Sequence, residues 1–141
     1  MTPTLLGRWQ TRILLLSTVG VLITLPFALG IISPGGGEYF LILIYIAIFG
    51  IFWDIAYQYI QRYRWDCDWP AVLQLLAGIW EAVFVVAIAT TIGLPGIPKE
   101  KFLLGSFFFH YSSVWLGVFV ASQSLMRIFF PRSRFRGGQW L

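Results

Sequence analysis

Four stretches of almost continuous apolar residues alternate along the chain with short stretches rich in glycine, proline or charge. The apolar stretches cover residues 13–32, 39–60, 71–92 and 102–125. Each has about the 20 residues that a helix needs to cross the ~30 Å hydrocarbon layer of a bilayer. Because the links are short, consecutive helices should be antiparallel neighbours. The pattern predicts an all-α integral membrane protein, an antiparallel four-helix transmembrane bundle that forms one four-pass domain over residues 1–141.

Positive charge indicates how this bundle is oriented. Eight arginines fall on one side of the membrane: Arg8, Arg12, Arg62, Arg64, Arg127, Arg132, Arg134 and Arg136. Lys99 and Lys101 fall on the other side. The positive-inside rule therefore predicts that both termini are cytoplasmic, with a basic cytoplasmic tail over residues 126–141. We expect the protein in a bacterial cytoplasmic (inner) membrane or in an internal membrane.

Composition favours a bilayer environment. The chain is 58% hydrophobic and 11% charged, and its mean hydropathy is +0.78. A soluble domain of this size could not bury so much apolar surface. The net charge of +4 is no more than the predicted orientation produces, so nucleic acid is not an expected partner. The single cysteine, Cys67, allows no intrachain disulfide and no CxxC redox or zinc motif.

The first apolar stretch has a second interpretation as a cleaved signal peptide. Arg8 and Arg12 precede it, and Ala28-Leu29-Gly30 has the small-x-small pattern of a cleavage site. The stretch is longer than the roughly 7–15 apolar residues of a signal-peptide core, which favours a retained helix.

Small and polar residues recur along one face of each predicted helix, at the spacing of a helical turn. These faces comprise Ser17, Gly20, Thr24 and Ala28; Gly50, Asp54, Tyr57 and Gln61; Gln74, Gly78 and Glu81; and Ser106, His110, Ser113, Gly117, Ala121 and Ser124. Lipid offers polar groups no hydrogen bonds, and small residues let backbones approach closely. We therefore expect the four faces to meet inside the bundle.

Three of these interior residues are titratable and lie deep in the predicted membrane. At 1.5 Å per residue, Asp54, Glu81 and His110 lie about 9, 15 and 18 Å from its cytoplasmic edge. A charged carboxylate at the bilayer centre costs at least ~2.5 kcal/mol, so both should be paired, protonated or hydrated. The predicted intramembrane polar cluster comprises Asp54, Gln74, Glu81, His110, Thr24 and Tyr57. Such a cluster indicates either a path for protons or ions, or a hydrogen-bonded network that fixes helix register.

His110 also raises the question of a cofactor or a catalytic site. One histidine in a chain cannot supply bis-histidine haem ligation, and there is no CxxCH motif. A metal site from Asp54, Glu81 and His110 would rest on ligand types alone. Nearby serines lack the GxSxG motif of a nucleophile elbow. We expect a hydrogen-bonded core histidine, no cofactor, no metal, no catalytic residues and no enzymatic activity.

Arginine and aromatic residues cluster where the predicted cytoplasmic interface lies. They comprise Arg62, Arg64, Trp65 and Trp69 in the second link, and Arg132, Arg134, Arg136 and Trp140 in the tail. Basic residues attract anionic lipid headgroups, and tryptophan is favoured at this depth. Arg62 and Arg64 can instead pair with Asp66 and Asp68. We predict that both segments anchor the protein at the interface or dock a partner protein.

Two functions are favoured by the sequence, and a membrane enzyme or cofactor binder with His110 as ligand or base is a third, weaker alternative. The first is a non-enzymatic accessory, assembly or scaffold subunit of a larger membrane complex, favoured by the small extramembrane mass and by mid-span aromatics such as Trp53, Trp80 and Trp115. The alternative is a small oligomeric transporter or proton-coupled carrier that uses Asp54, Glu81 and His110. Expected partners are the lipid bilayer and either another membrane protein or further copies of this chain.

Overall fold

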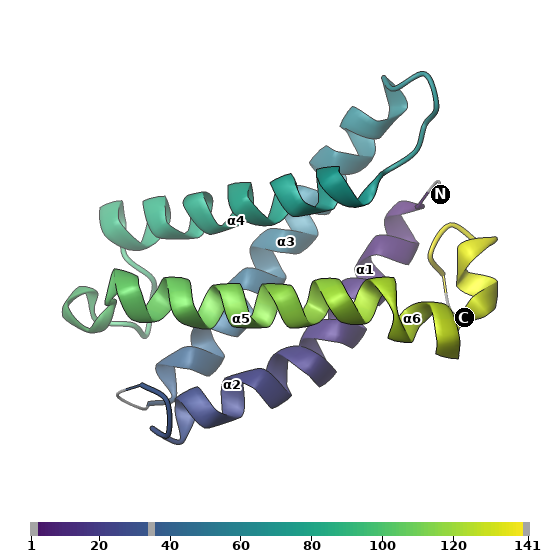
Figure 1. Cartoon of the computed structure of the whole chain (residues 1–141). Helices are drawn as coiled ribbons and strands as arrows, with labels where there is room; N and C mark the ends of the chain where they lie inside the picture. Colours follow the sequence, from purple (N-terminus) through teal and green to yellow (C-terminus); the bar gives the residue numbers. More distant parts are fainter. Residues whose placement is uncertain (1–2, 34–35, 140–141) are drawn as a thin grey trace.

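The computed structural model describes residues 3–33 and 36–139 (Figure 1). The described part contains no β-strand, and four of its helical spans are long and apolar enough to cross a membrane. These spans are Leu5–Ala28, Glu38–Arg62, Ala71–Thr91 and Leu104–Phe129. The expectation of an all-helical chain with four candidate membrane spans is therefore confirmed.

The first span consists of α1 (Leu5–Leu15), a π-helical turn η1 (Leu16–Gly20) and α2 (Val21–Ala28). It begins before the predicted stretch 13–32 because the Thr4 hydroxyl caps it, accepting a hydrogen bond from the Gly7 N–H at 3.2 Å. The earlier start places Arg12 inside the helix rather than in front of it.

The second and third spans, α3 (Glu38–Arg62) and α4 (Ala71–Thr91), lie close to the predicted bounds. Pro70 holds an extended ψ of 158° immediately before α4, which fits its predicted place at the start of this helix. The fourth span consists of α5 (Leu104–Gln123) and α6 (Leu125–Phe129). Helix therefore continues past residue 125 into the part of the chain that was predicted as a tail.

The four spans form a ring in which each packs on its sequence neighbours and the fourth packs on the first (Figure 1). The largest fully buried side chains are Phe27, Phe107, His110, Val85 and Thr24. Large apolar side chains such as Leu22, Phe52 and Val83 are exposed on the outside of the ring. An outer surface of this kind is suited to lipid rather than to water.

Most of the positions predicted to face inward are buried. The four in α3 are all buried: Gly50, Asp54, Tyr57 and Gln61. In the first span Gly20 and Thr24 are buried, but Ser17 is exposed. The turn η1 explains this difference, because the wider π-turn shifts the register of α1 relative to α2.

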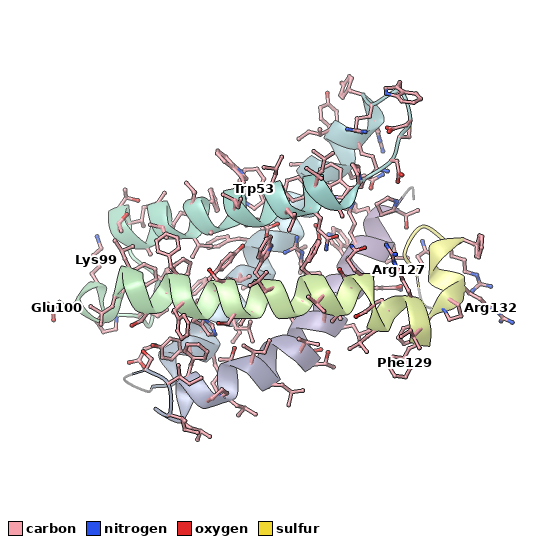
Figure 2. All side chains as sticks on the ribbon, in the orientation of Figure 1. Trp53, Lys99, Glu100, Arg127, Phe129 and Arg132 are labelled. Atoms are coloured by element: carbon pink, nitrogen blue, oxygen red, sulfur yellow. The ribbon has the colours of Figure 1, made fainter. Side chains whose placement is uncertain are left out.

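The two ends of the chain lie side by side. The Thr4 N–H donates to the Gly137 carbonyl at 2.7 Å, and the Thr11 hydroxyl donates to the Gly138 carbonyl at 3.3 Å. We refer to residues 131–139 as the C-terminal segment. Figure 2 shows Phe129 and Arg132 at this end of the bundle and Lys99 and Glu100 at the other.

Candidate functional site

One arginine joins the two buried carboxylates. The Arg12 guanidinium donates to Asp54 through Nε and Nη2, each at 2.9 Å to a different oxygen. It donates to Glu81 through Nη1 and Nη2, again at 2.9 Å to each oxygen. Both carboxylates are therefore held in the two-pronged geometry that gives strong charge-assisted hydrogen bonds. We call Arg12, Asp54 and Glu81 the charged triad.

The triad depends on three helices, since Arg12 comes from α1, Asp54 from α3 and Glu81 from α4. Asp54 and Glu81 are 3% and 6% exposed, so water screens the charges little. Two negative charges and one positive charge leave an excess of one negative charge when both carboxylates are ionised. Removing one member of such a buried group lowers the free energy of unfolding, because it leaves a charge without its partner. Substitutions in the triad should therefore destabilise the bundle.

The triad lies in the wall of a cavity of about 590 Å³. Ile46, Glu81 and Tyr111 line its inner part, while Asp68, Trp69 and the C-terminal segment line the part near the chain ends. Ligand sites in proteins commonly have volumes of about 300–1,000 Å³. The cavity is therefore large enough for a small organic molecule.

A second arginine, Arg8, lines the outer part of the cavity. Its Nη2 donates to the Gln61 side chain at 2.7 Å, and its guanidinium lies 4.5 Å from the centre of the Trp69 ring. Gln61 in turn donates to the Cys67 carbonyl at 2.6 Å. Trp69, predicted to anchor at the interface, thus faces inward and also packs on Tyr57 at 5.3 Å between ring centres.

Other members of the predicted polar cluster also line the cavity. Gln74 donates to the Ser122 hydroxyl at 3.2 Å and accepts from Gln123 at 3.1 Å, which ties α4 to α5. The Tyr57 hydroxyl donates to the Ala77 carbonyl at 3.4 Å. Tyr111, not singled out from the sequence, donates to the Gly78 carbonyl at 2.6 Å.

His110 and Thr24 form a separate pair. The Thr24 hydroxyl donates to the Gly20 carbonyl at 2.7 Å, so it accepts from the His110 Nε2–H at 2.9 Å. The imidazole packs edge-on against Phe27 and Tyr39, and its Nδ1 has no partner among the described residues. No hydrogen bond within residues 3–33 and 36–139 joins His110 to the triad. The titratable ladder considered from the sequence is thus divided into two sites.

The second link contains one of the ion pairs that the sequence suggested. Arg64 donates to Asp66 through Nε at 3.0 Å and through Nη2 at 2.8 Å. This hydrogen bonding lowers the pKa of Asp66 to about 2. Arg62 and Trp65 are exposed, the latter by 95%, as an interfacial anchor would be.

The basic tail is described only in part. Arg132 and Arg136 are exposed at the end of the bundle where the chain ends meet. Trp140 and the Arg134 side chain lie outside what the structure describes. Pro131, Phe135 and Gly138 of the C-terminal segment line the outer part of the cavity, a role that the sequence did not suggest.

The most important residue that sequence reasoning missed as part of the site is Arg12. It was counted as an interfacial charge because the first helix was expected to start at residue 13. Thr4 is a good capping residue directly before Leu5, and a helix that starts there carries Arg12 two turns inward. A nearby cation is also one of the ways to stabilise two buried carboxylates, which supplies a second signal.

Comparisons with family models, with curated proteins and with solved structures give no significant match. The function must therefore be inferred from the chemistry of the charged triad and its cavity.

Proposed function

We propose that this chain is a multi-pass membrane protein that works as a small proton-coupled carrier. The observation that carries the proposal is the charged triad in the wall of a cavity of about 590 Å³. Ionisable groups inside membranes commonly mark paths for protons, ions or substrates. A solute in this cavity would lie beside two carboxylates that can also take up a proton.

The orientation follows from charge. We place both chain ends on the cytoplasmic side and treat successive spans as antiparallel, because the arginine-rich end carries Arg62, Arg64, Arg132 and Arg136. The opposite end carries Lys99. In this orientation the cavity lies towards the cytoplasm, and the interfacial arginines lie at headgroup depth, where they attract anionic lipids.

The triad supplies the moving part of this carrier. Protonation of Asp54 or Glu81 would remove one charge that holds Arg12, and the freed guanidinium could turn towards the remaining carboxylate. The π-helical turn η1 begins four residues after Arg12, and such turns often occur at functional sites in helices. Movement of α1 about this turn would couple protonation to the shape of the cavity.

The carrier has more support than the accessory subunit that was the first expectation from the sequence. That expectation relied partly on mid-span aromatics being available to a partner. Phe107 is instead 1% exposed, and Trp115 packs directly on Gly78 and lines the cavity. Trp80 and Phe109 do face outward, as lipid-facing residues also do. A single chain forms the whole cavity, so a homo-oligomer is not required to build the site.

Proton movement into liposomes tests the proposal. Purified protein is reconstituted into liposomes that contain a trapped pH-sensitive dye, and a membrane potential is imposed. Four amphiphilic solutes are then added in turn: a cation, an anion, a zwitterion and a neutral compound. We expect at least one solute to accelerate proton movement by roughly tenfold over protein-free liposomes, and Asp54→Asn or Glu81→Gln to abolish the effect.

Matched controls remove carboxylates elsewhere. Asp66→Asn lies in the second link and Glu100→Gln at the opposite end, outside the cavity, so both should keep wild-type proton movement. The proposal fails if no solute moves protons in the wild-type protein. In that case, the tagged protein should be purified in mild detergent. If a larger membrane complex is recovered with it in stoichiometric amount, the accessory subunit becomes the favoured function.

A further inference from the structure

We infer that the solute of this carrier is an amphiphilic organic cation, an inference that rests on the proposed function of the cavity. Three features of the cavity support this inference. Its inner part, at the charged triad, carries more carboxylate than guanidinium charge, and its walls are both aromatic and apolar.

The inner charge is the first feature. The four hydrogen bonds from Arg12 reach one lone pair on each carboxylate oxygen, which leaves further lone pairs on Asp54 and Glu81. Arg8 and Arg127 also line the cavity, but the Arg8 guanidinium is bonded to Gln61 and stacked on Trp69, and Arg127 donates to the Gln123 side chain. No ion pair within the described residues joins Arg8 to either carboxylate. A cationic group beside the triad would neutralise the excess charge.

The aromatic wall is the second feature. Tyr57, Trp69, Tyr111 and Trp115 all line the cavity. The faces of aromatic rings attract cations, and such rings recognise substituted ammonium groups in other sites. Arg8 already lies over Trp69, at 4.5 Å from the ring centre, which shows that a cation fits against this wall. An anion would meet both the carboxylates and the negative faces of these rings.

The apolar lining is the third feature, and it favours an organic cation over a hydrated metal ion. Leu15, Leu16, Val114 and Val118 line the cavity alongside the aromatic rings. Apolar groups of a ligand would be buried against these side chains, while its charged group approached the triad. The ligand class is therefore a molecule with one positive charge and a bulky apolar body.

Such a ligand would compete with a proton, because either one can neutralise the triad. The titratable and charged groups that line the cavity with the triad are Arg8 and Arg12 from α1, Asp54 and Tyr57 from α3, Asp68 from the second link, Glu81 from α4, Tyr111 from α5 and Arg127 from α6. The arginines stay charged across the accessible pH range, so proton uptake falls to the carboxylates. Protonation of a carboxylate would remove the charge that attracts the cation, so a bound proton and a bound cation should exclude each other.

Two probes of matched shape and opposite charge test the inference. Tetraphenylphosphonium and tetraphenylborate are titrated calorimetrically into the wild-type protein in mild detergent, with empty micelles as the background. We expect the cation to bind roughly tenfold or more tightly than the borate near pH 8.

Variants then locate the bound cation. Glu81→Gln should weaken tetraphenylphosphonium binding by roughly tenfold, whereas Glu100→Gln should bind as the wild type does. Size-exclusion chromatography reports whether each variant is folded. The comparison of the two probes on wild-type protein needs no variant, so it decides the charge class even if Glu81→Gln does not fold.

The outcomes separate this inference from the proposed function. Tighter binding of tetraphenylborate overturns the cation assignment, and so does equal binding of tetraphenylphosphonium by wild type and folded Glu81→Gln. If no probe binds but an anionic, zwitterionic or neutral solute drives proton movement, the cation assignment fails and the carrier stands. If no probe binds and no solute moves protons, both fail.

Discussion

The guanidinium of Arg12 lies directly against Gly50. It fills the space that the Cβ of any other residue at position 50 would occupy. A methyl group at this position would overlap Nη1 and lie 2.5 Å from Cζ. The far end of an arginine side chain can usually move aside. Here it is held by four hydrogen bonds to Asp54 and Glu81, so Gly50 is part of what shapes the charged triad.

Gly50→Ala should therefore weaken the triad. We expect the free energy of unfolding in mild detergent to fall by about 1 to 3 kcal/mol, the usual cost of adding a methyl group to a packed interior. Thermal and denaturant unfolding of the purified protein would measure this change. Gly105→Ala is the matched control, because a methyl group at Gly105 would meet nothing within 4 Å. Equal stabilities for the two variants would contradict the packing of Gly50 on Arg12.

The C-terminal segment depends on a second glycine. A Cβ at Gly7 would overlap the Gly137 carbonyl oxygen and would lie 2.9 Å from the Gln139 nitrogen. These are backbone atoms, so they cannot rotate away as a side chain does. Gly137 and Gly138 both have positive φ, 62° and 89°, which glycine adopts without strain.

Gly7→Ala should release the C-terminal segment from α1. We expect faster amide hydrogen exchange, by roughly tenfold, at Thr4, whose N–H would lose its Gly137 acceptor, and over residues 131–139, which would no longer be held against α1. Hydrogen exchange with mass spectrometry measures the change directly. Gly37→Ala serves as the control, since a methyl group there would meet nothing within 4 Å. Unchanged exchange in Gly7→Ala would show that the segment is held by other contacts.

The sequence predicted the helices well, for a physical reason. Twenty apolar residues in a row leave the chain few alternatives in a bilayer, since a membrane-embedded backbone must satisfy its own hydrogen bonds. The inward face of α3 was predicted equally well, because Gly50, Asp54, Tyr57 and Gln61 follow one regular helical stripe. In the first span the same periodicity misplaced Ser17, because nothing in the pattern revealed the π-turn η1.

The contacts between side chains within the site could not be predicted from periodicity. Depth in the membrane placed Asp54, Glu81 and His110 near one another, but depth does not decide which side chains touch. Arg12 can reach Glu81 only because its long side chain crosses the space beside Gly50. Contacts of this kind depend on how the helices are rotated against each other, and a single sequence does not give that rotation.

The Arg64–Asp66 pair gives a prediction outside the membrane spans. Hydrogen bonds from Arg64 lower the pKa of Asp66 from an ordinary 3.8 to about 2. Arg64→Gln should therefore raise this pKa towards 3.8, and it should stay below 3.8 because the Asp68 N–H still donates to the carboxylate. The shift can be followed by carbon NMR of the carboxyl group during a pH titration. Arg62→Gln, at the exposed last residue of α3, should leave the pKa low.

The same pair should contribute little to stability, and that small contribution should disappear in acid. Because the folded-state pKa of Asp66 is lowered, its contribution is present above the ordinary pKa and is lost as the pH falls from 3.8 towards 2. The side chains are partly exposed, so the contribution itself should be close to zero near neutral pH. A clear loss of stability in Arg64→Gln at neutral pH would contradict this assignment and indicate a structural role for the link.

His110 and Thr24 permit a test of whether their hydrogen bond is structural. Thr24→Val would leave the buried His110 Nε2–H without its partner, which should lower the free energy of unfolding by about 1 to 3 kcal/mol. His110→Phe should cost less, because phenylalanine suits the contacts with Phe27 and Tyr39 and the Thr24 hydroxyl keeps its bond to Gly20.

The double variant distinguishes a structural pair from two independent residues. With Thr24→Val and His110→Phe combined, no polar group is left unpaired, so the loss should be close to that of His110→Phe alone. The coupling free energy from the double-mutant cycle should then be about 1 kcal/mol or more. Solute-driven proton movement should persist in His110→Phe, since this residue lies outside the cavity and bonds to neither carboxylate. Additive losses would rule out the structural pair, and loss of proton movement in folded His110→Phe would return His110 to the proton path.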